Sequence, residues 1–252
     1  MNSSINERSA IEVFRSWQKV LRIVLPVFFL LLFTCASYEY TFRNGWTSWD
    51  DDVYVTDNVY VRGFTPENLQ AVWTKQFNGS YLPLTMMSFM LDYSISEYDP
   101  FVFHLTGFLF HAANTLLVYL FIVRLTKGNQ FAAFVVTVIF GVHPMHVESV
   151  AWISARKDVL SGFFFLLSLI AYLKYVQEAK QNGLIVSFIC FVLALFSKIV
   201  VLTLPVVLLL IDRFHGRAWH KNLFIEKISF FVAGVVFAII GLYSQHEAGA
   251  IR

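Results

Sequence analysis

The most concentrated group of reactive side chains is a run of three carboxylates, Asp50, Asp51 and Asp52, followed by Tyr54 and Asn58. Carboxylates this close together repel one another, which favours protonation of at least one of them. Such a cluster suits a general base or a divalent-cation site. A solvated acidic loop would have the same composition, so the cluster alone does not predict a function.

The run from His143 to Glu148 forms a second reactive segment, in which Pro144 ends an apolar stretch. The zinc-protease motif places two histidines four residues apart around a glutamate, whereas His143 and His146 are three residues apart. Three roles stay open for His143, His146 and Glu148: metal binding, hydrogen bonding to a substrate or its phosphate, and packing at an interface.

Three basic side chains, Arg156, Lys157 and Lys198, lie next to or between apolar runs. Arg can bind a phosphate through two parallel hydrogen bonds, and Lys adds a point charge. Lys198 stands alone between apolar segments, where an ionisable group is costly and by default functional. We therefore expect these three residues to bind a phosphate. Side chains that reach out to the membrane surface are the alternative for Arg156 and Lys157.

Two further histidines, His104 and His111, lie seven residues apart in an apolar segment and so share one face of a helix. Asn114 is near that face. These side chains must point into a helix bundle, where they would bind substrate or make buried structural hydrogen bonds, the second role being the more common.

The elements that hold these residues are predicted to be membrane helices. Of the 252 residues, 57% are hydrophobic, 17% aromatic and only 14% charged, whereas a soluble domain carries about 25% charged residues. Cys35 and Cys190 both lie in apolar stretches, which predicts neither a disulfide nor a cysteine metal site. The composition therefore indicates an all-α polytopic membrane protein and excludes a soluble globular domain, a disordered chain and a disulfide scaffold.

Apolar stretches of about 20 residues predict about seven membrane-spanning helices. They lie in a membrane domain over residues 20–252, which follows a cytoplasmic tail over residues 1–19. The candidates are Val20–Tyr38, Phe101–Val123, a span from Phe131 that is interrupted at His143-Pro144, Val159–Val176, two short helices within Leu184–Ile211 that meet in a tight turn at Lys198, and Ile228–Tyr243.

The distribution of charge predicts the orientation of these spans. With a cytoplasmic N-terminus, most of the 19 Lys and Arg residues fall inside and most of the 17 acidic residues outside, as the positive-inside rule requires. Residues 39–100 then form a long outer loop. The acidic run, the histidine segment and the three basic residues all fall on this outer face, which suits an enzyme that uses a lipid-linked phosphate.

Two helices are expected in the 39–100 loop. Thr65-Pro66-Glu67 is a helix start, with Thr as N-cap, Pro at the first helical position and an acid in the first turn. Tyr81–Tyr93 is a second apolar, aromatic-rich segment, and Asn78-Gly79 between the two is a turn signal. We expect both helices to lie on the membrane surface.

The motif Asp50-Asp51-x-x-Tyr54-Val55-x-x-Asn58 resembles the first-loop motif of the membrane-embedded GT-C glycosyltransferases. Within that superfamily the chain is similar to the membrane part of the transmembrane-and-tetratricopeptide-containing O-mannosyltransferases and their bacterial relatives. Further matches follow in order along the chain: Leu82-Pro83-Leu84-Thr85, Phe103-His104, His111, Asn114, the block from His143 to Leu160, Ser197-Lys198, Leu204-Pro205 and Leu210-Ile211-Asp212.

The resemblance implies transfer of a sugar, with mannose as one candidate, from a polyprenyl- or dolichyl-phosphate donor to a protein Ser/Thr hydroxyl. The reaction would occur on the outer or luminal face, with inversion at the anomeric carbon. It also implies Asp50 or Asp51 as the catalytic carboxylate. The phosphate role of Arg156, Lys157 and Lys198 rests on their charge and their side of the membrane, not on the resemblance.

Relatives of this kind carry further spans and tetratricopeptide repeats, and no such repeat is visible here, so we expect a truncated chain. Its expected partners are membrane lipid, the lipid-linked sugar, a protein acceptor and a tetratricopeptide-repeat protein, but no nucleic acid. A divalent cation is the one cofactor considered. Two alternatives stay open: a non-catalytic truncated subunit, and a protein that binds or transports a lipid phosphate. Short loops favour the bacterial inner membrane over the endoplasmic reticulum.

Overall fold

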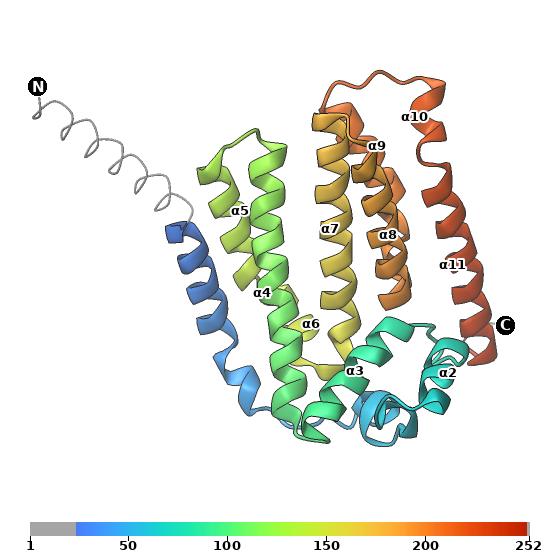
Figure 1. Ribbon diagram of the computed structural model, residues 1–252. Coiled ribbons are helices and arrows are strands. Elements are labelled where there is room, and N and C mark those ends of the chain that lie inside the picture. Colours follow the sequence, from blue (N-terminus) through green and yellow to red (C-terminus); the bar gives the residue numbers. More distant parts are fainter. Residues whose placement is uncertain (1–23, 251–252) are drawn as a thin grey trace, which may run out of the picture.

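The computed structural model describes residues 24–250. The expected cytoplasmic tail over 1–19 and the first residues of the first span, 20–23, lie outside this described part. Within it the chain is helical apart from turns and loops, and the one bridge between extended residues joins Phe77 and Ser80. The predicted all-α fold is confirmed. Figure 1 shows the long helices side by side with roughly aligned axes, and α2 and α3 across one end of the bundle.

Four helical segments are long and apolar enough to cross a membrane: Val24–Arg43, α4 (Pro100–Leu125), Ile153–Glu178, which contains α7 (Arg156–Glu178), and Lys221–Glu247, which contains α10 (Lys221–Ile225) and α11 (Ile228–Glu247). A fifth span is possible if α5 (Gln130–Val142) and the following Pro144–Ala151 segment, bent by 49°, are counted together. The chain is therefore a polytopic membrane protein. The predicted count of seven spans is not confirmed.

The shortfall arises at the predicted break at Lys198, where two helices are too short to count as full spans. Helix α8 (Gln181–Ser197) ends directly before the lysine, the 3₁₀ helix η6 (Ile199–Thr203) follows it, and α9 (Leu204–Phe214) completes the return. Lys198 itself is extended, with φ −160° and ψ 131°. The predicted pair of short helices with a turn at the lysine is confirmed.

The loop over residues 39–100 folds into a small helical layer of its own. Its elements are η1 (Glu39–Arg43), the π-helical turn η2 (Asp52–Thr56), η3 (Val59–Val61), α2 (Pro66–Thr74) and α3 (Pro83–Ser96). Thr65 caps α2 by accepting a hydrogen bond from the N–H of Asn68 at 3.2 Å, so the predicted helix start is confirmed. Tyr54, Met86, Phe89 and Phe103 form the core beneath this layer. Its predicted place on the membrane surface stays a prediction.

Helices α7 and α8 pack most closely of all the membrane helices, because a glycine and two serines line their contact. A Cβ on Gly183 would lie 2.8 Å from the carbonyl oxygen of Ala171 and 2.8 Å from the N of Tyr175. Ser168 donates a hydrogen bond to the carbonyl of Ser187 at 2.8 Å. Small residues allow such close approach in membrane bundles, where apolar burial against lipid adds little.

A neutral cluster of four charged groups closes the end of the bundle away from α2 and α3 (Figure 1). Lys227 is fully buried and contacts Asp212 at 2.5 Å, and Arg217 pairs with Glu226 at 2.7 Å. Tyr172 donates its hydroxyl to Asp212 at 2.7 Å. Two cations and two anions balance, which is what allows these charges to be buried together.

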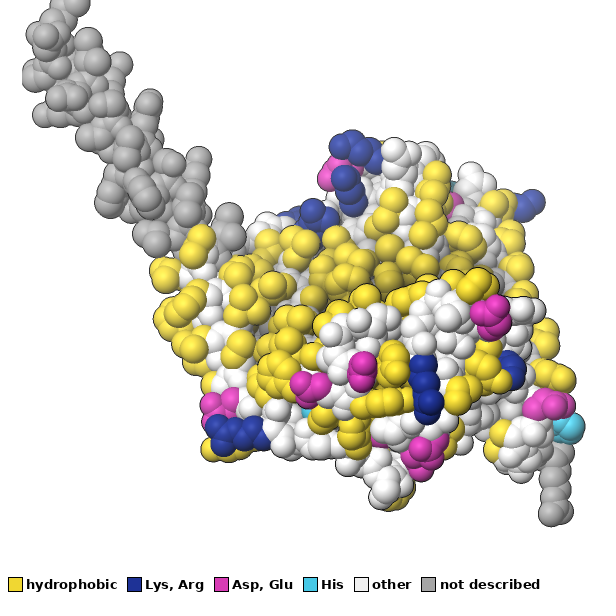
Figure 2. Space-filling model, turned by 60° about the horizontal axis from the view of Figure 1, so that its bottom comes forward, with side chains coloured by type: hydrophobic (Ala, Val, Ile, Leu, Met, Phe, Trp, Pro, Cys, Tyr) yellow, Lys and Arg dark blue, Asp and Glu magenta, His cyan; other side chains and the backbone are white. Residues whose placement is uncertain are grey.

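Hydrophobic side chains cover the sides of the molecule, as Figure 2 shows, whereas the charged side chains gather towards its ends. Large apolar residues stay exposed along α5 and α11, among them Ile139, Val235 and Ile239. An apolar belt of this size on a soluble protein would cause aggregation, so we assign it to contact with lipid.

Candidate active site

Asp51 is fully buried, and both of its carboxylate oxygens accept hydrogen bonds from other residues of the chain. Its Oδ1 accepts from the N–H of Ser154 at 3.0 Å and from the Ser154 hydroxyl at 2.5 Å. Its Oδ2 accepts from the N–H of Thr47 at 2.9 Å and from the Thr47 hydroxyl at 3.0 Å. Asp51 therefore joins the first loop to the turn η5 (Ile153–Ala155) that precedes α7.

Asp50, by contrast, is partly exposed and accepts one side-chain hydrogen bond, from the amide of Asn78 at 3.1 Å. Asn78 and Gly79 form the predicted turn, since both have positive φ values, 46° and 67°. This turn brings Ser80 close to Tyr54, just after the acidic run. Of the two carboxylates that the sequence left open, Asp50 is the one that a substrate can reach.

Tyr54 connects the acidic run to Lys157. The ammonium of Lys157 donates to the Tyr54 hydroxyl at 3.4 Å and lies 4.7 Å from the centre of its ring. Burial is the largest influence on the phenol and raises the pKa of Tyr54 above its ordinary value, so the hydroxyl stays protonated at neutral pH. Lys157 is thus held at the edge of the first loop by a neutral aromatic partner.

Lys198 forms an ion pair with Asp158, one residue beyond Lys157 on α7. Both side chains are 30% exposed, so the pair is open to a further ligand. Thr85 of α3 stabilises the break at Lys198, because its hydroxyl donates a hydrogen bond to the carbonyl of Ser197 at 2.9 Å. Lys198, which stands between two apolar segments, therefore has the counterion that an ammonium in an apolar setting requires.

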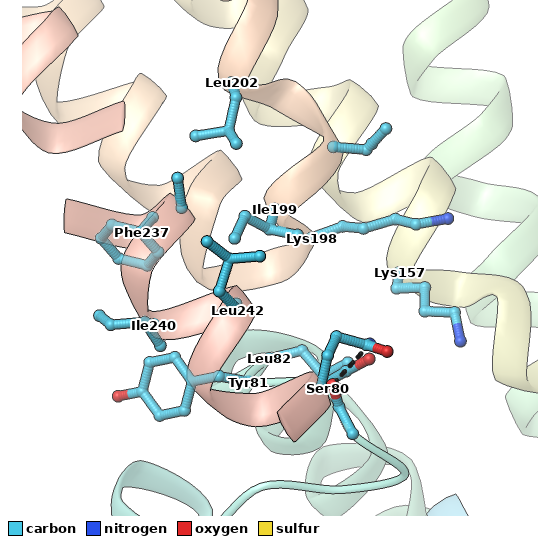
Figure 3. Close-up of a pocket in the computed structure, with 15 residues that line it drawn as sticks. Ser80, Tyr81, Leu82, Lys157, Lys198, Ile199, Leu202, Phe237, Ile240 and Leu242 are labelled. Carbon is cyan, nitrogen blue, oxygen red and sulfur yellow. Dashed lines mark hydrogen bonds between the residues drawn. The ribbon is translucent and has the colours of Figure 1, made fainter. Parts of the chain in front are cut away.

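Both lysines line a cavity of about 550 Å³, here called cavity A. It lies between residues 79–82, the Lys198 break and the C-terminal half of α11. Figure 3 shows Lys157 and Lys198 at one side and the apolar side chains of Leu202, Phe237 and Ile240 at the other. A long apolar wall with cations at one end is the complement of an amphipathic anion such as a lipid phosphate.

Arg156 takes no part in cavity A. It is 1% exposed, pairs with the equally buried Asp92 of α3 and donates to the carbonyl of Phe103 on α4. Its guanidinium also lies 4.8 Å from the centre of the Phe89 ring. Because these contacts occupy the side chain, we leave Arg156 out of the site and assign it to the packing of α3 against α4 and α7.

The histidine segment lies apart from cavity A. His143 and Glu148 are exposed, and His143 caps η4 (Pro144–His146) by accepting from the N–H of Met145 at 3.2 Å. His146 is half-buried and its ring centre lies 5.7 Å from that of His111, beside a second cavity. His104 is buried near the first loop, and neither ring nitrogen has a hydrogen-bond partner among residues 24–250.

Sequence reasoning overlooked Asn78, Ser80 and Asp158 as members of the site. Asp158 carried a usable signal, because a lysine between apolar runs needs a carboxylate and Asp158 follows the basic pair directly. For a metal the structure offers less: within residues 24–250 no group of three His, Cys, Asp or Glu side chains could hold one.

Fold and site together define a polytopic membrane protein in which two lysines line cavity A and a partly exposed carboxylate lies beside the turn that borders it. The chain is similar to human protein O-mannosyl-transferase TMTC3, at 30% identity over 146 residues, which is 54% of this chain and 15% of the relative. It is 41% identical to human TMTC2 over 104 residues, 41% of this chain and 12% of the relative. Human TMTC4 is 31% identical over 157 residues, 53% of this chain and 21% of the relative.

The predicted resemblance to the O-mannosyltransferases is thereby confirmed. The matched part spans only 12% to 21% of the length of these curated relatives. No family model matches the chain, and no solved structure matches it.

Proposed function

We propose that this chain is the membrane part of a glycosyltransferase that moves a sugar, mannose by the names of its relatives, from a polyprenyl-phosphate donor to a protein Ser/Thr hydroxyl. The observation that carries the proposal is the position of Asp50 beside the Asn78–Gly79 turn, whose Gly79 lines cavity A together with Lys157 and Lys198. Relatives named as protein O-mannosyl-transferases supply the reaction class.

The donor fits cavity A by chemistry. Its prenyl chain would lie along Leu202, Phe237 and Ile240, which form an apolar wall. Its phosphate would bind to Lys157 and Lys198, whose ammonium groups have protons left after their contacts with Tyr54 and Asp158. Both lysines stabilise the negative charge that grows on the phosphate as the sugar departs.

Asp50 would act as the general base. In the step, Asp50 takes the proton of the acceptor hydroxyl while the hydroxyl oxygen forms a bond to the anomeric carbon. The bond from that carbon to the phosphate oxygen breaks, and its electron pair leaves with the polyprenyl phosphate. A single displacement of this kind inverts the anomeric centre. Asp51 acts in a different way, because it holds the loop that carries Asp50.

The compartment and the domain division belong to the same proposal. Residues 20–252 would form the membrane domain, with the tail over 1–19 in the cytoplasm and the 39–100 loop on the outer or luminal face. The apolar belt supports the membrane domain, and the excess of Lys and Arg on the predicted cytoplasmic side supports this orientation. A bacterial inner membrane is the proposed location, with the endoplasmic reticulum as the alternative, and a tetratricopeptide-repeat protein the proposed partner.

The test uses the purified full chain in lipid nanodiscs, a radiolabelled polyprenyl mannosyl phosphate and a Ser/Thr-rich peptide. Asp50→Asn should lower turnover by about 10²- to 10⁴-fold, the usual contribution of a general base, with donor binding retained. Lys157→Gln and Lys198→Gln should each weaken donor binding roughly tenfold or more, as expected for a lost charge-assisted hydrogen bond.

Asp57→Asn is the matched control, because Asp57 is an exposed acid of the same loop, whereas only Asp50 is hydrogen-bonded to the Asn78–Gly79 turn beside cavity A. It should leave turnover and binding unchanged. Full turnover in Asp50→Asn would contradict its role as the base. Donor binding without transfer in the wild type would instead support a lipid-phosphate-binding protein, the alternative that cavity A also allows.

A further inference from the structure

A second cavity, here called cavity B, lies between α4, the end of α5, α6 (Val147–Ala151) and α7. Its volume is about 390 Å³, within the range of small-molecule sites. Polar side chains from three helices and one turn converge on it: His111, Asn114, His146, Ser149 and Asp158. Phe140 and Phe165 provide aromatic walls.

The polar groups of cavity B are arranged mainly as hydrogen-bond acceptors. Nε2 of His111 lies 3.0 Å from the carbonyl oxygen of Gly141, and Nδ1 of His146 lies 2.8 Å from that of Phe140. Each contact requires a proton on that nitrogen, which in a neutral ring leaves the other nitrogen as an acceptor.

Asn114 and Asp158 add further acceptors. The Asn114 amide donates to the carbonyl of Val159 at 2.8 Å, and its oxygen, in a side chain that is 3% exposed, has no hydrogen-bond partner among residues 24–250. A buried acceptor without a donor costs about 1–3 kcal/mol and calls for a partner. The Asp158 carboxylate binds Lys198 through one oxygen, so it has further acceptor sites.

A cavity lined by hydrogen-bond acceptors favours a ligand that carries several hydrogen-bond donors. An anion is disfavoured, because no Lys or Arg is among the described residues that line cavity B. A metal is disfavoured, because no suitable trio of ligands exists within residues 24–250. A single Ser or Thr hydroxyl would provide one donor for several acceptors. A sugar ring provides several hydroxyl donors, and its C–H faces suit the walls formed by Phe140 and Phe165.

The Lys198–Asp158 ion pair places cavity B next to cavity A. Lys198 lines cavity A and Asp158 lines cavity B, and their side chains are in contact. A phosphate bound to Lys198 would therefore lie at the boundary between an apolar cavity and one rich in acceptors. In a polyprenyl-phosphate sugar the phosphate likewise joins an apolar prenyl chain to a polar sugar.

We propose that cavity B binds the sugar of the donor, with Asn114, His146 and Asp158 accepting hydrogen bonds from its hydroxyls. This inference rests on the proposed function, and it adds the residues that distinguish a glycosylated donor from a bare lipid phosphate. Gly162 belongs to the same argument, because a Cβ there would lie 3.4 Å from the Asn114 amide nitrogen, so that a larger side chain would fill the cavity.

The experiment compares two probes in binding to the purified full chain in nanodiscs: polyprenyl mannosyl phosphate and polyprenyl methyl phosphate. Both are phosphodiesters of equal charge, and only the first carries a sugar. The wild type should bind the mannosyl diester at least about tenfold more tightly, about 1.4 kcal/mol. Asn114→Leu and Gly162→Leu should each abolish this preference, so that the two diesters bind about equally, and should leave the affinity for the methyl diester unchanged.

Tyr119→Phe is the control for packing on α4, because Tyr119 is buried and lines neither cavity. It should keep the full preference for the sugar. Equal binding of both diesters by the wild type, or a preference that survives in Asn114→Leu and Gly162→Leu, would overturn the role of cavity B alone. A wild type that binds neither diester would overturn the proposed function and this inference together.

Discussion

The pair Asp50 and Asp51 offers the sharpest test of the site, because neighbouring carboxylates are assigned different roles. The perturbation is Asp51→Asn, which keeps the size of the side chain and replaces one acceptor oxygen by an N–H₂ group. We expect this variant to lose activity because the first loop loosens, whereas Asp50→Asn loses activity in a folded protein.

The size of the effect follows from the contacts of Asp51. Each carboxylate oxygen accepts one backbone N–H, from Ser154 at 3.0 Å or from Thr47 at 2.9 Å. A hydroxyl can rotate to adapt, but a backbone N–H cannot, so an amide in either orientation sets donor against donor. Losing a hydrogen bond to a charged acceptor costs about 1.5–3 kcal/mol and an unsatisfied buried N–H about 1–3 kcal/mol, together about 3–6 kcal/mol.

The assay is thermal unfolding of the detergent-solubilised chain, followed by tryptophan fluorescence, together with turnover. For a chain of this size about 3–6 kcal/mol corresponds to a fall in Tm of roughly 10 °C. Asp50 is partly exposed, so Asp50→Asn should shift stability by less than about 0.5 kcal/mol.

One result would refute this reasoning. If Asp51→Asn unfolds at the wild-type temperature and still loses turnover, the four hydrogen bonds to Asp51 do not stabilise the loop. The reacting carboxylate would then be Asp51, and the loop would have to open before a substrate could reach it.

Three further predictions concern the framework around the site. Asp92→Ala leaves Arg156 buried without a partner and should destabilise the chain by about 3–5 kcal/mol in the same unfolding assay; recovery in the double variant with Arg156→Met would show that the pair is responsible. Lys227→Met should lower the free energy of unfolding by about 3–5 kcal/mol, because it leaves excess negative charge in the cluster of four charged groups; an unchanged Tm would contradict this. Gly183→Ala should lower Tm through backbone overlap worth about 1–3 kcal/mol, whereas Gly234→Ala, where a Cβ finds ordinary contacts, should not.

Local signals in the sequence were sufficient where short-range chemistry determines the structure. Thr65 and Pro66 predicted the start of α2, and Asn78-Gly79 predicted the turn between α2 and α3. Lys198 predicted the break between α8 and α9. For the first two the deciding interaction lies within a few residues along the chain, whereas the break at Lys198 was signalled by a single charge within an apolar run. The number of spans was harder to predict, because hydropathy does not distinguish a full-length span from a short helix.

The roles of charged residues could not be predicted as well, because they depend on contacts between distant segments. Arg156 and Lys157 are adjacent and look alike in sequence, yet one is buried against Asp92, 64 residues away, and the other faces cavity A. A helix turns by about 100° per residue, so neighbours on α7 point to different surroundings. Likewise the role of Asp51 differs from that of Asp50 because Asp51 contacts Ser154, which lies 103 residues further along the chain.

The break at Lys198 has a consequence for the depth at which a lipid phosphate would be bound. Helix α8 has 17 residues, about 26 Å at 1.5 Å per residue. On the other side, five residues of η6 at about 2 Å each and 11 of α9 reach about 27 Å together. Both arms are only slightly shorter than the roughly 30 Å apolar layer of a bilayer. If both arms start from the opposite surface of the bilayer, Lys198 falls close to the level of the lipid headgroups, where a lipid phosphate would meet it by lateral diffusion without entering the hydrocarbon.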